Sequence, residues 1–73
     1  MSQDLKIGVT IRIVALPAYL KTADPMPMLL PPSRLELGAI GVITDRKPGN
    51  YWVVKFDRSS FLLEDRYLEV VAA

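Results

Sequence analysis

The side chains that could do chemistry in this 73-residue chain are few in kind, because the sequence contains no histidine and no cysteine. Nucleophilic catalysis of the Ser-His or Cys-His type therefore has no imidazole to accept the proton. The usual ligands of zinc, copper and haem are missing as well. We expect no metal and no other cofactor, which leaves carboxylates, lysines and tyrosines as the acid-base candidates.

The carboxylates do not suggest a catalytic site. General acid-base chemistry depends on positioned groups within reach of the same substrate atoms. Here the acids fall in segments expected to be loops and strand ends, and no spacing forces two of them together: Asp24, Glu36, Asp45, Asp57, Glu64, Asp65 and Glu69. We therefore predict that the protein is not an enzyme and acts by binding.

Length and composition are those of one small globular domain spanning residues 1–73. The chain is 51% hydrophobic and 23% charged, with a net charge of +1, so it should fold by itself. Bases and acids are interspersed, unlike the basic stripe of a nucleic-acid-binding domain, so no nucleic-acid partner is expected. The polar start and the absence of a long apolar run predict a cytoplasmic protein without membrane insertion.

Short strands separated by turn residues predict an all-β fold. Alternating apolar side chains indicate strands over residues 9–14, 39–45, 51–56, 61–64 and 68–71. In residues 51–56 we expect Trp52, Val54 and Phe56 to face the core and Lys55 to face solvent. Pro48-Gly49 fits the centre of a type II turn, and residues 65–67 can form a 3₁₀ turn. This order predicts a five-stranded SH3-like barrel.

The segment between the first two strands holds five of the six prolines, in residues 17–32. Prolines lack the backbone donor and disfavour helix before them, so we expect a long Pro/Met-rich loop after the first strand. Exposed methionines and leucines there would form an adaptable surface for a protein partner. The alternative, a loop that folds back and caps one end of the barrel, stays open.

Three stretches carry a resemblance to a known family: residues 19–29 with the following Pro31-Pro32, residues 48–56, and residues 61–69. They resemble the SipA family of small cyanobacterial proteins, which interact with the sensor histidine kinase NblS. The resemblance implies an SH3-like regulator in a two-component system. It would bind the ATP-binding catalytic region of the kinase and stimulate autophosphorylation during high-light and nutrient stress.

On this hypothesis the partner is a histidine kinase, with its response regulator as a further possible partner, and the protein is a monomer. An apolar anchor in the loop would be surrounded by a charged rim. The predicted partner-binding residues are Tyr19, Lys21, Met26, Met28, Leu29, Leu30, Arg34, Tyr51 and Arg58.

Two other functions stay open at this point. The first is a small SH3-like subunit that docks an electron carrier in a photosynthetic complex. The second is an SH3- or KOW-like module that binds nucleic acid or a proline-rich peptide, although the sequence offers only a thin aromatic wall for such a peptide.

Overall fold

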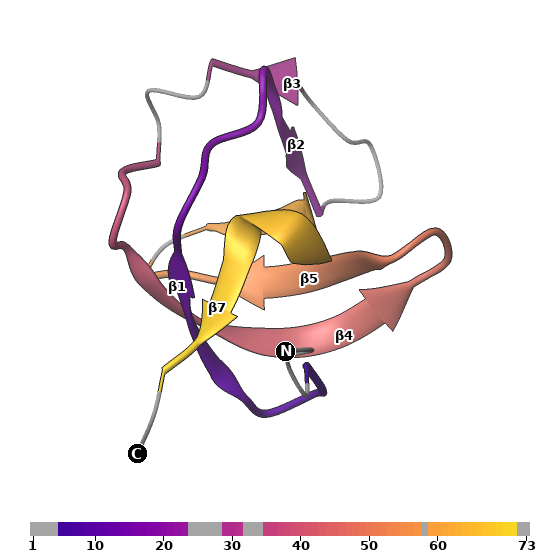
Figure 1. Cartoon of the computed structure of the whole chain (residues 1–73). Helices are drawn as coiled ribbons and strands as arrows, with labels where there is room; N and C mark the ends of the chain where they lie inside the picture. Colours follow the sequence, from indigo (N-terminus) through magenta and orange to yellow (C-terminus); the bar gives the residue numbers. More distant parts are fainter. Residues whose placement is uncertain (1–4, 24–28, 32–34, 58, 72–73) are drawn as a thin grey trace.

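The computed structural model of the protein describes residues 5–23, 29–31, 35–57 and 59–71. Over these residues the chain is all-β with one short helical turn, which confirms the expected class (Figure 1). Seven strands form a single antiparallel sheet: β1 (Thr10–Ile13), β2 (Leu20–Thr22), β3 (Leu29–Leu30), β4 (Ile40–Lys47), β5 (Tyr51–Lys55), β6 (Ser60–Glu64) and β7 (Leu68–Val70). A 3₁₀ helix, η2 (Asp65–Tyr67), joins β6 to β7, as the sequence predicts.

The sheet has the strand order β3-β2-β6-β5-β4-β1-β7. Strands β4, β5 and β6 are consecutive neighbours joined by short turns, whereas β1 pairs with both β4 and β7. Figure 1 shows β4 as a long curved strand below β5, with β1 and β7 crossing near one of its ends. The curvature gives the sheet one enclosed side, where the core lies.

The core is built by alternation along the strands, since successive side chains of a strand point to opposite faces. The predicted inward set is confirmed: Trp52 and Val54 are buried, Phe56 packs against them half-buried, and Lys55 is exposed. The buried apolar residues of the cluster come from all the longer strands and from one connection: Ile11, Ile13, Leu20, Leu35, Ile43, Trp52, Val54, Phe61, Leu63 and Leu68.

The expected long loop over residues 17–32 is wrong in part, because this segment contributes strands β2 and β3. Lys21 and Thr22 pair with β6, and Leu20 and Lys21 pair with β3. The pairing satisfies backbone groups that an open loop would leave to water. Leu20 is completely buried, so the hairpin is part of the core and not only an excursion from it.

The β4–β5 hairpin turns at Pro48-Gly49-Asn50, between the paired residues Lys47 and Tyr51. Gly49 has φ +82°, which is the value required at the third position of the predicted type II turn. Asn50 follows with φ +63°. Both residues are therefore in the left-handed region, where a Cβ atom is unfavourable.

Replacing Gly49 with alanine is expected to lower the free energy of unfolding by about 1 kcal/mol, because alanine disfavours this φ. The new Cβ would meet only ordinary contacts, at 3.6 Å from the Tyr51 ring, so the loss reports the backbone alone. Urea unfolding followed by tryptophan fluorescence measures it. Asn50→Gly is the control and should not destabilise, since glycine tolerates φ +63°. A Gly49→Ala variant as stable as the parent would contradict this turn geometry.

Within the described ranges, no helix has the length and the apolar character needed to cross a lipid bilayer.

Candidate protein-binding surface

Three of the predicted binding residues lie on one face of the sheet, the face directed away from the core. Lys21 is paired with Leu29 on one side and with Leu62 on the other. Leu62 is paired in turn with Val53, which lies two residues after Tyr51 on β5. Directly paired residues and residues two apart point to the same side of a sheet. We call the set Lys21, Leu29, Tyr51 and Leu62 the hairpin face.

The hairpin face combines apolar and charged side chains that reach solvent. Leu29 is 67% exposed, Lys21 and Tyr51 are exposed, and Leu62 is half-buried beneath them. Tyr19, just before β2, is also exposed. Exposed leucine, tyrosine and lysine side chains on one face are the mixture found at protein interfaces, where aromatic anchors are surrounded by polar groups.

The remaining predicted binding residues are not brought to this face or are not described. Leu30 is paired with the buried Leu20, and it packs half-buried against the core. Its side chain therefore points away from the hairpin face. Four predicted residues lie outside the described residues: Met26, Met28, Arg34 and Arg58.

Arg66, which is not among the predicted binding residues, lies at one end of the hairpin face. The Arg66 guanidinium donates a hydrogen bond to the Tyr67 hydroxyl at 2.8 Å, and it lies 4.9 Å from the centre of that ring. Its Nη2 is also 3.5 Å from the Glu64 carboxylate, and Glu64 pairs with Tyr51. The hydrogen bond to Tyr67, followed by the charge of Glu64, raises the pKa of Arg66. A fixed positive charge thus stands beside two tyrosines.

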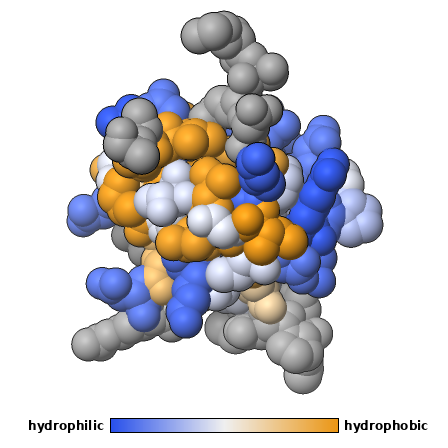
Figure 2. All heavy atoms as spheres, turned by 90° about the horizontal axis from the view of Figure 1, so that it is seen from below, coloured by the Kyte–Doolittle hydropathy of each residue, from blue (hydrophilic) through white to orange (hydrophobic). Residues whose placement is uncertain are grey.

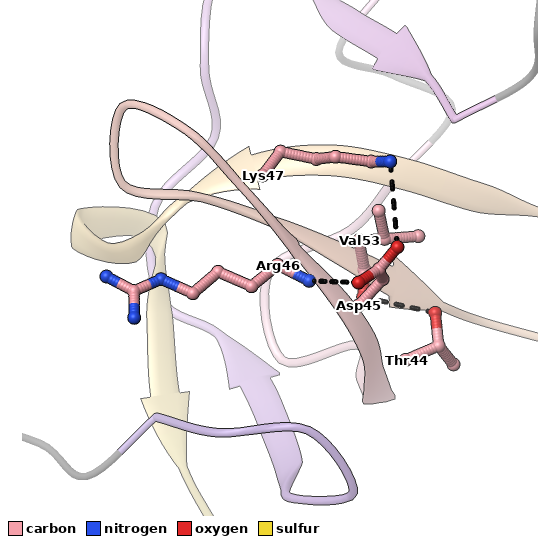
Figure 3. A network of polar contacts seen from close by, with 5 residues as sticks. All are labelled: Thr44, Asp45, Arg46, Lys47 and Val53. Atoms are coloured by element: carbon pink, nitrogen blue, oxygen red, sulfur yellow. Dashed lines mark hydrogen bonds and ion pairs between the residues drawn. The ribbon is translucent and has the colours of Figure 1, made fainter.

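Local contacts shape β4 where it approaches the hairpin turn (Figure 3). Ile43 pairs with Val54 and Asp45 with Val53, so Thr44 is an extra residue in a β-bulge. The Thr44 hydroxyl donates to the Val53 carbonyl at 3.4 Å. A bulge adds twist and bends its strand, which is consistent with the curvature of β4.

Beyond the bulge, Asp45 organises the charged end of β4. Its carboxylate accepts a hydrogen bond from the Arg46 backbone N–H at 2.8 Å and lies 3.6 Å from the Lys47 ammonium. The Arg46 side chain extends away from this group (Figure 3) and places its guanidinium 5.2 Å from the centre of the Trp52 ring. Arg46 therefore covers the buried tryptophan with a cation–π contact.

A second surface lies on β4 and the end of β5. A hollow of about 300 Å³ is lined there by Ile40, Gly41, Val42, Lys55, Phe56 and Asp57. Figure 2 looks at the molecule from below the view of Figure 1 and shows apolar side chains gathered among polar ones. The alternating pattern predicts a strand through Ile40 and Val42, but it does not predict that both side chains are exposed. The sequence does contain a signal for apolar side chains on both faces, because apolar residues occupy both alternating sets of positions in this strand.

The described residues contain no group of three or more His, Cys, Asp or Glu side chains that could hold a metal ion. The charged side chains near both surfaces are engaged in pairs or exposed singly. Their arrangement can support recognition of another molecule through apolar contact and charge.

Comparisons with known proteins assign the chain to a group different from the one expected. A family model described as "Protein CHLORORESPIRATORY REDUCTION 42-like" matches residues 7–68. The chain is 37% identical over 68 residues to "Protein CHLORORESPIRATORY REDUCTION 42, chloroplastic" of Arabidopsis thaliana. The match covers 92% of this chain and 56% of that relative, so the chain spans little more than half of the relative's length. No solved structure matches the chain.

These matches overturn several expectations. The resemblance to the SipA family is wrong, since the matching family model is a different one. The function as a regulator in a two-component stress response and the histidine-kinase partner are wrong with it. The expected cytoplasmic location is contradicted by a relative that is named as chloroplastic. The alternative of a subunit in a photosynthetic complex agrees better with both matches.

Proposed function

Because the chain belongs to the CHLORORESPIRATORY REDUCTION 42-like family, we propose that it is a non-catalytic module that binds a protein of the chlororespiratory electron-transfer machinery. The name of the Arabidopsis relative, which links it to chlororespiratory reduction in the chloroplast, supports this choice of partner. The proposal retains the small photosynthetic subunit considered from the sequence, and it gives the chain a docking role.

One observation carries the proposal: the sheet register aligns Lys21, Leu29 and Tyr51 on a single solvent-facing surface. These residues come from three strands, so the surface exists only when the sheet is formed. Leu29 provides an apolar anchor, Tyr51 provides an aromatic side chain with a polar tip, and Lys21 provides charge. A surface of this composition is suited to a protein partner rather than to a small substrate.

We propose further that the fold is a five-stranded SH3-like barrel. Strands β7-β1-β4-β5-β6 would be the barrel, and the β2–β3 hairpin would be an insertion added beside β6. The bulge at Thr44 and the 3₁₀ turn before β7 support this architecture, because a small barrel needs a strongly bent strand and a short connection between its sheets. The hairpin then presents its outer side to the partner.

Replacing Leu29 with glutamate is expected to reduce binding of the partner complex at least about tenfold, because a buried charge replaces the apolar anchor. The measurement uses tagged chain added to gently solubilised photosynthetic membranes, with the recovered electron-transfer subunits quantified by mass spectrometry. Tyr51→Ala should weaken recovery in the same way.

Leu37→Glu is the matched control, because Leu37 is 62% exposed against 67% for Leu29 and lies in the connection before β4. It should bind like the parent. Equal recovery with the Leu29 and Leu37 variants would remove the hairpin face from the proposal. Recovery of no chlororespiratory or other electron-transfer subunit by the parent chain would remove the proposed function itself.

A further inference from the structure

The β4 face (Ile40, Val42, Lys55 and Asp57) has an internal regularity that the proposed function does not use. Ile40 and Val42 are 54% and 40% exposed and point outward from β4. Val42 is paired with Lys55 on β5. Asp57 lies two residues beyond the end of β5 and lines the same hollow as Ile40. All four residues line the hollow described above. Two rows result, Val42 with Lys55 and Ile40 with Asp57.

The two charges of the β4 face have no ion-pair partner among the described residues. Arg12, which is paired with Ile40 on the flanking strand, differs in this respect, because it forms an ion pair with Glu69. Lys55 and Asp57 are both exposed, they have opposite sign, and they lie two residues apart on the same side of the apolar pair. A binding partner that complements these two charges must present an acidic and a basic side chain at the same spacing.

A second copy of the chain presents that arrangement. In such a dimer two β4 faces pack against each other about a two-fold axis that lies between the two rows and runs perpendicular to the strands. Each row of one copy then lies opposite the other row of the second copy. Lys55 then faces Asp57 of the other copy, and Asp57 faces its Lys55. Ile40 faces Val42 in the centre. This reciprocity is what an isologous two-fold interface requires.

The flanking strand agrees with this axis. Arg12 is paired with Ile40 and Thr10 with Val42, so Arg12 would face Thr10 of the second copy, and no like charges are opposed. An axis along the strands would instead set Ile40 against Asp57 and Val42 against Lys55. That arrangement buries each charge against an apolar side chain, which is unfavourable.

We infer that the chain self-associates through the β4 face as a two-fold dimer, held by an apolar centre and two reciprocal Lys55–Asp57 ion pairs. The dimer replaces the monomer expected from the sequence, and it leaves the hairpin face free. Among the described residues of this face only Ile40 and Val42 supply the apolar centre, which is small for a stable interface. The association is therefore weak and depends on concentration.

Sedimentation equilibrium of the purified chain tests this inference. The apparent mass should rise from 8.2 kDa toward twice that value. We expect the rise between about 10 µM and about 1 mM, the range of a weak interface. Lys55→Glu and Asp57→Lys should each raise the dissociation constant at least about tenfold, because each creates two like-charge contacts. Circular dichroism and melting should be unchanged, since both side chains are exposed.

An equimolar mixture of the two variants separates this dimer from other modes of association. In the mixed pair the glutamate introduced at position 55 of one copy faces the lysine introduced at position 57 of the other. The unchanged Asp57 and Lys55 face each other as in the parent, so association should return to the parent level. Asp65→Lys, a charge reversal on η2 away from the β4 face, should leave association unchanged. A parent chain that remains at 8.2 kDa up to about 1 mM, or a mixture that remains as weak as either variant, would overturn the inference.

Discussion

Replacing Trp52 with alanine is expected to produce the largest loss of stability of any single change considered in this protein, about 3–5 kcal/mol. The side chain is only 7% exposed and belongs to the core cluster formed by every longer strand. A 73-residue domain has a total free energy of unfolding of roughly 4–11 kcal/mol. The variant should therefore be partly unfolded at 25 °C, with its peptide amides losing most of their protection from hydrogen exchange.

Trp52→Phe is the informative comparison. The indole Nε1 is buried and has no hydrogen-bond partner in the part of the chain that the structure describes. Phenylalanine keeps most of the ring volume and removes this unpaired donor, whose burial costs about 1–3 kcal/mol. Removal of the donor favours the folded state, whereas the smaller ring disfavours it. We therefore expect Trp52→Phe to lower the free energy of unfolding by about 1 kcal/mol or less. A phenylalanine variant as unstable as the alanine variant would show that the indole nitrogen is satisfied in solution.

Arg46→Ala separates the contribution of the covering guanidinium from that of the indole itself. The cation–π contact with the Trp52 ring lies at an exposed end of the sheet and should contribute about 0.5–1 kcal/mol. The loss is measured by the same urea unfolding. A loss as large as that of Trp52→Ala would mean that Arg46 does more than cover the ring.

The second large effect is expected at Gly41, a glycine required by close packing and not by its backbone dihedral. A Cβ atom there would lie 2.8 Å from Cε1 of Phe56, 2.8 Å from Cγ1 of Val54 and 3.0 Å from the Lys55 carbonyl oxygen. Gly41→Val should lower the free energy of unfolding by about 2–3 kcal/mol, because β5 must move to accept the side chain. The melting temperature should fall by about 15 °C for a domain of this size.

Gly38→Ala provides the control for Gly41, since nothing lies within 4 Å of a Cβ built at Gly38. Gly38 has φ +86°, which alanine disfavours, so Gly38→Ala should lower the free energy of unfolding by about 1 kcal/mol through the backbone alone. A double variant that combines Gly41→Ala with Phe56→Leu should be less destabilised than the sum of the two single variants, because the smaller side chain relieves one contact. Strict additivity would show that β4 and β5 do not approach each other as closely as described.

The candidate site could be predicted only in part. Lys21, Leu29 and Tyr51 could be selected as partner-binding residues from the sequence, because they are of interface type and lie near prolines or a turn. Their alignment on one face could not, since it depends on the pairing of β2 with β6, which brings together segments about forty residues apart. Arg66 was overlooked for the same reason, because its role follows from its contacts with Tyr67 and Glu64.

The family resemblance shows a different limit. Short runs of residues that shape turns and strands recur in small barrels with unrelated tasks, so they indicate a fold more reliably than a partner. Residues 19–29 suggested a kinase regulator, and the match over residues 7–68 corrected this. The all-β class did not depend on that assignment and was unaffected.

The sequence alone determined the local features of this protein: the period-two strands with Trp52 and Val54 inward, the turn at Gly49 and the 3₁₀ turn at residues 65–67. Each of these follows from neighbouring residues and from backbone geometry. The tertiary structure decided which strands pair, why Gly41 must have no side chain, and why Ile40 and Val42 face solvent. An apolar strand has the same local pattern whichever strand lies beside it, so its register and its buried side are fixed only by packing against distant parts of the chain.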